Sequence, residues 1–156
     1  MESIVSYTRE QYQYVKGSRN VLFEYCETIS AEDFVNQNSS FGRGGSIRNL
    51  LVHIANTYEY WIANFALKKN RIYAEYENYK TIKEVKLLFE IVDDFMEEFI
   101  SQIDQIKDFE IQNTQNTAKP LQLFSHVITH EYHHKGQILS LSRHLGYTPV
   151  DTDIMR

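Results

Sequence analysis

The sequence has few of the residues that interrupt helices or cross-link chains. Its 156 residues include one cysteine, two prolines and six glycines. So few prolines and glycines leave room for long uninterrupted helices, and the composition predicts a mostly helical protein. The single Cys26 cannot form an internal disulfide and is typical of a reducing compartment. Because no histidine lies near Cys26 in the sequence, we expect a buried, inert thiol rather than a nucleophile.

Two further absences limit where the protein acts and what it contacts. No apolar run approaches the roughly 20 residues of a membrane span, and residues 1–14 lack the apolar centre of a signal peptide. The net charge is −5, and the basic residues are scattered rather than aligned on one face. Such a charge distribution argues against a nucleic-acid partner. We therefore expect a cytoplasmic protein that contacts neither a membrane nor nucleic acid.

The remaining composition is that of a single globular domain. A chain of 156 residues can bury roughly two thirds of the surface that it exposes when unfolded. Apolar residues recur at steps of three and four in four segments, which is the spacing of amphipathic helices. With no alternating strand pattern, the sequence predicts an all-α protein, a four-helix bundle over residues 1–156. The expected helices are Thr8–Thr28 with Thr8 as N-cap, Ser46–Phe65 with Ser46 as N-cap, Thr81 to Ile106, and Pro120–Gly146.

The connections between these helices contain one candidate motif. Residues 36–45 are rich in Asn, Ser and Gly, a composition that can cradle phosphate. They lack the Lys-Ser/Thr ending of a P-loop and no strand precedes them, so a plain connector is favoured. Residues 68–80 are interpreted as a connection with a short turn of helix. Residues 108–119 are expected to be irregular, with Phe109 and Ile111 extended, and the tail Tyr147–Arg156 to fold back over the bundle.

Residues 124–136 contain four of the six histidines. On a helix, His130 and His134 lie about 40° apart, one turn above the other, so both imidazoles can bind one ion. They share a face with Leu123, Val127 and Ile138, and such a helix would turn both imidazoles toward the interior. A buried imidazole is costly unless it is hydrogen-bonded or metallated. His126 lies at the edge of this face, and His133 lies about 100° from His134, too far to share its metal.

Two known metal motifs fit this stretch incompletely. His130 to His134 matches H-E-x-x-H, the zinc-peptidase signature in which the glutamate activates water. The longer form of that signature requires glycine and histidine where this chain has Gln137 and Ser140, and the other form requires a later glutamate, which is absent. Glu131 to His134 also matches E-x-x-H, half of a di-iron site. The second half is missing, because Leu50 stands three residues before His53.

A mononuclear site is the third interpretation, favoured over the peptidase. It requires a third ligand from another helix, and His53 is the histidine that can supply it. His53 lies on the flank of the second expected helix, beside Thr57 and Tyr60. Three neutral imidazoles leave the +2 charge of an ion uncompensated and leave coordination positions open, which is typical of a site for chemistry.

The stretches from Gly45 to Ile62 and from His126 to Ile138, with the L-G-x-x-P of residues 145–149, resemble the DinB/YfiT-like family over nearly the full chain. The resemblance implies a four-helix bundle, often a homodimer, that holds a divalent metal ion. Carried onto this sequence, the ligands are one histidine of the second helix and two of the last: His53, His130 and His134. By the same resemblance, His126, His133 and Gln137 are packing or second-shell groups.

Better-understood relatives in this family transfer bacillithiol, mycothiol or glutathione, so the resemblance implies a thiol and an electrophile as small-molecule partners. A thiol that replaces metal-bound water has a pKa lowered toward or below 7. We therefore expect metal-dependent thiol transfer in detoxification or stress response. Glu131 is a candidate proton acceptor, with a second-shell or surface role as its alternative. A metal-dependent hydrolase and a non-catalytic metal-binding protein remain alternatives, and zinc, nickel, manganese and iron all suit three imidazoles.

Overall fold

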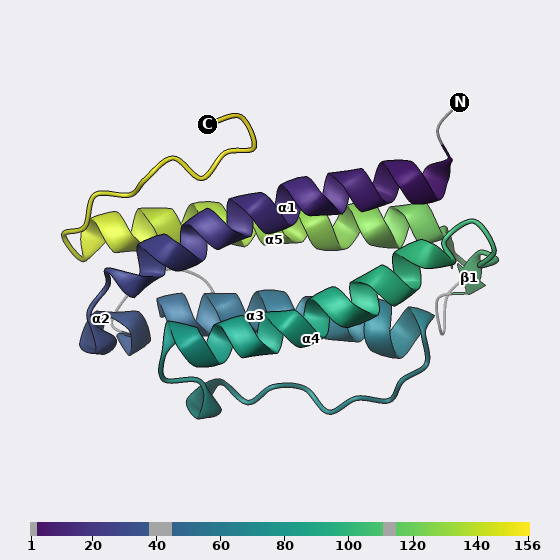
Figure 1. Cartoon of the computed structure of the whole chain (residues 1–156). Helices are drawn as coiled ribbons and strands as arrows, with labels where there is room; N and C mark the ends of the chain where they lie inside the picture. The colour runs from purple at the N-terminus through teal and green to yellow at the C-terminus, as the bar shows by residue number, and fades with distance from the viewer. Residues whose placement is uncertain (1–2, 38–44, 111–114) are drawn as a thin grey trace.

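The computed structural model describes residues 3–37, 45–110 and 115–156. Four long helical segments form a bundle, in which α1 lies beside α5 in one layer and α3 beside α4 in the other (Figure 1). The expected all-α four-helix bundle is confirmed. Its segments are α1 (Ile4–Glu27), α3 (Ile47–Tyr58) continued by the π-helix η1 (Glu59–Ala66), α4 (Ile82–Ser101) and α5 (Pro120–His144).

Side-chain caps set where these helices begin. The Ser46 hydroxyl accepts a hydrogen bond from the backbone N–H three residues later, as predicted for this N-cap. The Thr81 hydroxyl makes the same bond at the start of α4, where the sequence predicted a helix to begin. The first helix begins earlier than expected, with Ser3 as its N-cap. Thr8 lies inside that helix, and its hydroxyl donates to the Ile4 carbonyl. Pro120 opens α5, and Gly146 with φ +95° follows its end, because glycine adopts this left-handed conformation without steric cost.

Short elements join the long helices. The expected turn of helix between α3 and α4 is the 3₁₀ segment η2 (Tyr76–Asn78). The strands β1 (Phe109–Glu110) and β2 (Thr117–Ala118) pair antiparallel, so Phe109 is extended as expected. The helix α2 (Ala31–Val35) was not predicted, and α4 ends at Ser101 rather than at Ile106. Residues 38–44 of the expected connector, and Ile111, lie outside the described residues.

A buried polar cluster joins all four long helices at the centre of the bundle. The Arg19 guanidinium of α1 donates from Nε and Nη2 to the two carboxylate oxygens of Glu131 in α5, at 2.7 and 3.0 Å. Its Nη1 lies 2.7 Å from the Asp93 carboxylate in α4. The Tyr58 hydroxyl of α3 donates to the same Glu131 carboxylate, and the Tyr12 hydroxyl donates to Asp93 at 2.6 Å. Paired in this way, the buried charges hold the four helices in one register.

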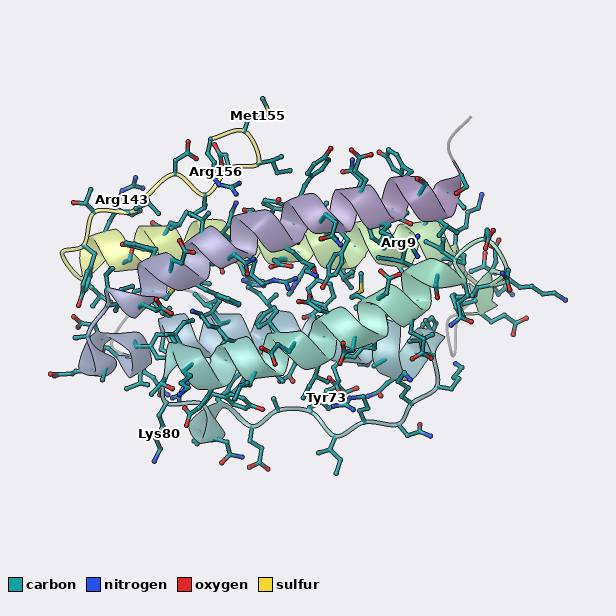
Figure 2. The ribbon with its side chains drawn as sticks, viewed as in Figure 1. Arg9, Tyr73, Lys80, Arg143, Met155 and Arg156 are labelled. Carbon is teal, nitrogen blue, oxygen red and sulfur yellow. The ribbon has the colours of Figure 1, made fainter. Side chains whose placement is uncertain are left out.

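The C-terminal tail folds back over α1 and α5, as predicted (Figures 1 and 2). The Lys135 ammonium donates to the Ser18 hydroxyl and to the Thr152 carbonyl, each at 2.9 Å, and the Ser18 hydroxyl also donates to Thr152. Arg156 reaches the Gly17 carbonyl from the end of the tail. Cys26 is buried as expected, and burial raises the pKa of its thiol to about 12, which keeps it protonated and unreactive.

Among the described helices, none has a stretch both long and apolar enough to cross a membrane.

Candidate metal centre

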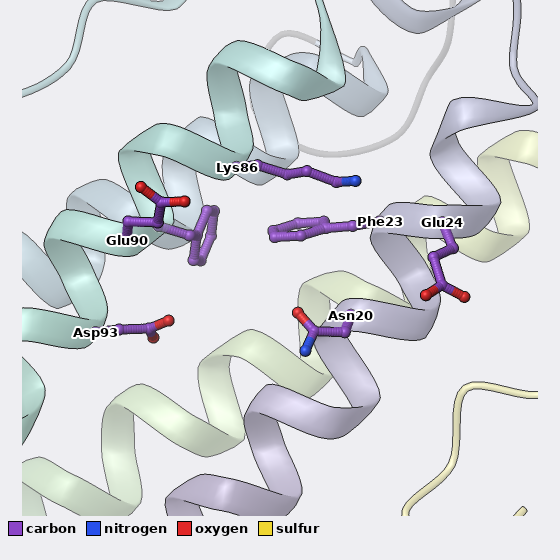
Figure 3. A pocket seen from close by; sticks show the side chains of 7 residues that line it. Asn20, Phe23, Glu24, Lys86, Glu90 and Asp93 are labelled. Carbon is purple, nitrogen blue, oxygen red and sulfur yellow. The ribbon is translucent and has the colours of Figure 1, made fainter.

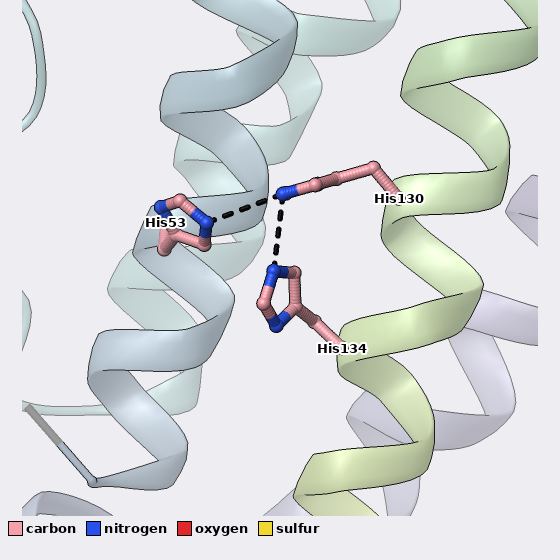
Figure 4. Close-up of side chains that lie close together, drawn as sticks. All are labelled: His53, His130 and His134. Atoms are coloured by element: carbon pink, nitrogen blue, oxygen red, sulfur yellow. Dashed lines mark hydrogen bonds between the residues drawn. The ribbon is translucent and has the colours of Figure 1, made fainter. Parts of the chain in front are cut away.

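Three histidines from two helices meet between α3 and α5 (Figure 4). The Nε2 atom of His130 lies 3.2 Å from Nε2 of His53 and 3.0 Å from Nε2 of His134. One nitrogen from each ring lies within 4.8 Å of the other two. His134 is 8% exposed, and His53 and His130 are half-buried. The structure thus brings together the three residues that the sequence singled out, although His53 is 77 residues from His130 in the chain.

The spacing of these nitrogens suits a divalent ion. Bonds of about 2.0–2.1 Å place two nitrogens roughly 3.0 Å apart at an octahedral angle and roughly 3.3 Å apart at a tetrahedral angle. The two shortest separations, 3.0 and 3.2 Å, fall at this scale. The group contains no carboxylate. The donor set therefore fits an ion that accepts imidazole nitrogens, and it leaves the ion's positive charge unneutralised.

Two neighbouring side chains orient the rings. Nδ1 of His134 lies 2.7 Å from the side-chain oxygen of Gln137, one turn further along α5. Since an amide oxygen only accepts, Nδ1 must carry the proton, and Nε2 then offers its lone pair to an ion. On the facing helix, the Thr57 hydroxyl donates to the His53 carbonyl and lies 3.4 Å from Nε2 of His130. The sequence placed Thr57 beside His53 but gave it no role.

The surroundings of His130 strongly favour its neutral form. Burial is the main cause, and repulsion by His134 and His53 adds to it, so that the pKa of His130 falls to about 3. Its buried Nδ1 atom has no hydrogen-bond partner among the described residues. A neutral imidazole is the form that binds a metal ion, so protons compete weakly at this ring.

This lowered pKa predicts a pH-dependent stability. Between its ordinary pKa of about 6.5 and about 3, the unfolded chain carries a proton at His130 that the folded chain lacks. The free energy of unfolding of chelator-treated protein should therefore fall as the pH drops through this window, and should be insensitive to His130 above it. Urea unfolding at pH 7 and pH 4.5 measures the loss. His130→Gln should lose less over the same interval, and equal losses in both proteins would contradict the assignment.

The other histidines lie around the site rather than in it. His126 and His133 are exposed, and their ring centres lie 6.1 Å from His130 and 4.8 Å from His134, respectively. The side-chain nitrogen of Gln137 lies 3.4 Å from Nε2 of His133, so Gln137 lies between His133 and His134. His144 is exposed at the C-terminal end of α5. His126, His133 and Gln137 thus contact the three histidines from outside the group, and their roles there stay predictions.

Glu131 belongs to the buried polar cluster at the centre of the bundle. It is 6% exposed, so the expectation of a surface position is wrong. Both carboxylate oxygens are held, by Arg19 and by the Tyr58 hydroxyl. In the H-E-x-x-H interpretation this carboxylate would activate water at the metal, but here it is bound to a guanidinium in the core. The sequence contained no signal for this pairing, because Arg19 lies 112 residues away.

Of two hollows at the surface of the bundle, one is lined by a histidine and the other is not. One of about 300 Å³ lies between α1 and α4 and is lined by Asn20, Phe23, Lys86, Glu90 and Asp93, with no histidine among its lining residues (Figure 3). A smaller one, of about 130 Å³, is mainly apolar and is lined by Trp61, Leu123 and His126. The second hollow shares His126 with the surroundings of the histidine group, since the His126 ring lies 6.1 Å from that of His130.

Fold and site together define a class: helical-bundle proteins with a three-histidine group suited to a divalent ion. A model of the DinB family matches residues 3–156. The chain belongs to the DinB family. It is also similar to the uncharacterized protein YizA of Bacillus subtilis (strain 168), with 27% identity over 154 residues that cover 92% of this chain and 91% of the relative.

Proposed function

We propose that His53, His130 and His134 bind one divalent ion, and that the protein transfers a low-molecular-weight thiol to an electrophilic small molecule. The observation that carries this proposal is the donor set: three imidazole nitrogens that converge with no carboxylate among them. A thiol that met a divalent ion at such a site would have its pKa lowered, because the ion's charge favours the thiolate. Bacillithiol, mycothiol and glutathione are the thiols of this class, and the reducing cytoplasm is where they are available.

The proposed reaction is a nucleophilic substitution at an electrophilic carbon of the small molecule. The thiol releases its proton to water, the sulfur lone pair forms a bond to carbon, and the leaving group departs with the electrons of its own bond to that carbon. Thr57 has a hydroxyl oxygen 3.4 Å from Nε2 of His130 and can accept a hydrogen bond from the incoming thiol. Gln137 would hold the proton of His134 on Nδ1 and so leave the Nε2 lone pair available to a bound ion. Glu131 takes no part, since Arg19 and Tyr58 hold its carboxylate.

The test uses a simple alkylating probe. Metal-loaded protein is mixed with iodoacetamide and, in turn, bacillithiol, mycothiol and glutathione, and thiol consumption is followed. One thiol should react faster than it does with His53→Ala protein, while His144→Ala, which changes an exposed histidine at the end of α5, should keep the wild-type rate. A rate equal to that of His53→Ala with all three thiols would reject thiol transfer. Ester hydrolysis without a thiol would then favour a hydrolase.

Gln137 offers a further check of the ligand assignment. Replacing Gln137 by leucine removes the acceptor at 2.7 Å from Nδ1 of His134 and should weaken metal affinity about 10–100-fold, the usual effect of losing such a partner. Competition with a fluorescent chelator measures this. Gln137→Glu restores an acceptor and should recover affinity. Unchanged affinity in Gln137→Leu would show that the His134 ring needs no such orientation.

The family resemblance also leads us to propose that the protein forms a homodimer. Light scattering on a size-exclusion column tests this directly, and a mass of about one chain would reject it.

A further inference from the structure

One segment beside the histidine group has an unusual backbone. After Tyr58 the helix widens into the π-helical segment η1, a geometry that is frequent at functional sites. Shortly beyond it, Lys68 and Asn70 have φ values of 56° and 53°, the two non-glycine residues with positive φ in the described ranges. Left-handed conformations cost free energy for a residue such as Lys68, whereas asparagine adopts them more readily. Two such residues near one another, next to a π-helix, indicate that the position of these side chains matters.

Other side chains fix this strained backbone in place. The Asn64 amide of η1 both accepts from and donates to the backbone of Arg71, at 2.7 and 2.9 Å. The Arg71 guanidinium lies 2.6 Å from the carboxylate of Glu59, which is 4% exposed. Asn56 makes the same pair of backbone bonds to Ala74. The loop is therefore held in its conformation before any ligand arrives.

The strained loop and η1 enclose a hollow of about 340 Å³, here called the aromatic hollow. It is lined by the rings of Tyr60, Trp61, Phe65 and Tyr73, together with Lys68 and Asn70. Tyr60 and Tyr73 are 47% and 44% exposed, and their near-parallel rings lie 6.5 Å apart, at the upper end of the range for stacked pairs. Figure 2 labels Tyr73 on the loop below the bundle. Both tyrosines are thus exposed at the hollow, although Tyr60 also packs against the Trp61 ring at 4.8 Å.

The charge of the aromatic hollow selects among aromatic ligands. Its lining includes the Lys68 ammonium and no carboxylate. Lys68 lies over the Phe65 ring at 5.1 Å, a position that leaves the ammonium at the wall of the hollow. We infer that the aromatic hollow binds a planar aromatic anion, with its ring against Tyr60, Tyr73 and Trp61 and its anionic group at Lys68. The volume is that of a small-molecule site.

The hollow adjoins the histidine group through Trp61. The Trp61 ring lies 5.5 Å from His126, whose ring lies 6.1 Å from His130. Trp61 also follows Thr57 by four residues, and Thr57 lies 3.4 Å from Nε2 of His130. If the thiol transfer proposed above takes place, a ligand in the aromatic hollow would be its electrophile, two ring contacts away from His130. Binding of the anion itself does not depend on that reaction.

The experiment measures binding in chelator-treated, thiol-free protein. Three probes are compared by calorimetry: 2-naphthoate, its neutral analogue 2-naphthamide, and cyclohexanecarboxylate, an anion without an aromatic ring. The naphthoate should bind at least tenfold more tightly than either analogue. Trp61 is the one tryptophan of the chain, so quenching of its fluorescence, corrected for probe absorbance, locates the probe.

Variants then test each contact. Lys68→Met should reduce the affinity for naphthoate to that for naphthamide. Tyr73→Ala should weaken the binding of both naphthoate and naphthamide. Matched controls are Lys83→Met, an exposed lysine of α4, and Tyr7→Ala, a 50% exposed tyrosine of α1. Lys68→Gly, which relieves the left-handed strain, should lose naphthoate affinity without any fall in melting temperature. A stable protein that no longer binds separates recognition from folding.

The two proposals fail separately. The aromatic-anion site is overturned if naphthoate binds no more tightly than the amide, or if its binding is unchanged in Lys68→Met. This holds even if the protein accelerates alkylation of a thiol by iodoacetamide. Tight, Lys68-dependent naphthoate binding upholds the site even if no thiol reacts.

Discussion

Replacing Arg19 by methionine should lower the free energy of unfolding by about 3–5 kcal/mol, which is the usual cost of breaking a buried ion pair. The Arg19 side chain is 3% exposed, and its removal leaves the Glu131 and Asp93 carboxylates without their cation. The Glu131 side chain, which is 7% exposed, would then carry a buried and uncompensated charge. Urea unfolding followed by circular dichroism measures the change.

Arg9 provides a matched control on the same helix. Its salt bridge to Glu97 has the same N–O distance, 2.7 Å, but its side chains are 41% and 53% exposed. Arg9→Met should leave the free energy of unfolding nearly unchanged, since exposed pairs contribute little. Adding Glu131→Leu to Arg19→Met should recover part of the lost free energy of unfolding, because it removes the unpaired buried carboxylate. Equal destabilisation by Arg9→Met and Arg19→Met would show that burial does not control the strength of these pairs.

Replacing His53 or His130 by alanine should abolish stoichiometric metal binding, with a loss of affinity of at least about 10³-fold. Removing one of three ligands is expected to exceed the 10–100-fold effect of an outer partner. The two residues come from different helices, so a shared loss identifies one site between α3 and α5. Elemental analysis of protein purified without chelators, and then supplemented with zinc, nickel, manganese or iron, gives the stoichiometry and the preferred metal.

His144→Ala is the control for this experiment, because it removes an exposed histidine at the end of α5. It should keep one ion per chain. Metal retained in His53→Ala but lost in His130→Ala would instead favour the H-E-x-x-H interpretation, which needs no ligand from α3. Absence of metal from wild-type protein after supplementation would reject the site.

Much of the fold was accessible from the sequence because its signals are local. Ser46, Thr81 and Pro120 each begin a helix as predicted, and their effects act within three or four residues. The same locality explains one error. Thr8 has the chemistry of an N-cap, but Ser3 also has it and lies upstream, and no short-range signal ranks one above the other. The change to π-helix after Tyr58 likewise left the hydrophobic pattern of that segment unbroken.

The residues of the candidate site likewise differ in how far the sequence predicted them. The His130 and His134 pair follows from a spacing of four residues on one helix, and the sequence alone determined that both rings face one side. His53 was the remaining histidine that could supply a third ligand, and the family resemblance implied the same residue. The structure places its Nε2 3.2 Å from that of His130. Gln137 could be assigned to the surroundings of the metal, but its bond to Nδ1 of His134 depends on rotamers that sequence does not specify.

By itself, then, the sequence determined the helices, most of their beginnings and the pair of histidines on the last one, because backbone hydrogen bonds and side-chain periodicity act within a turn or two. Only the tertiary structure decided which side chains from different helices meet. The sequence favoured a second-shell or surface role for Glu131, but the residue is buried and binds Arg19 from 112 residues away. The aromatic hollow depends on where the loop at Lys68 lies against η1. The rotation and packing of helices against one another set these contacts, and no local pattern encodes them.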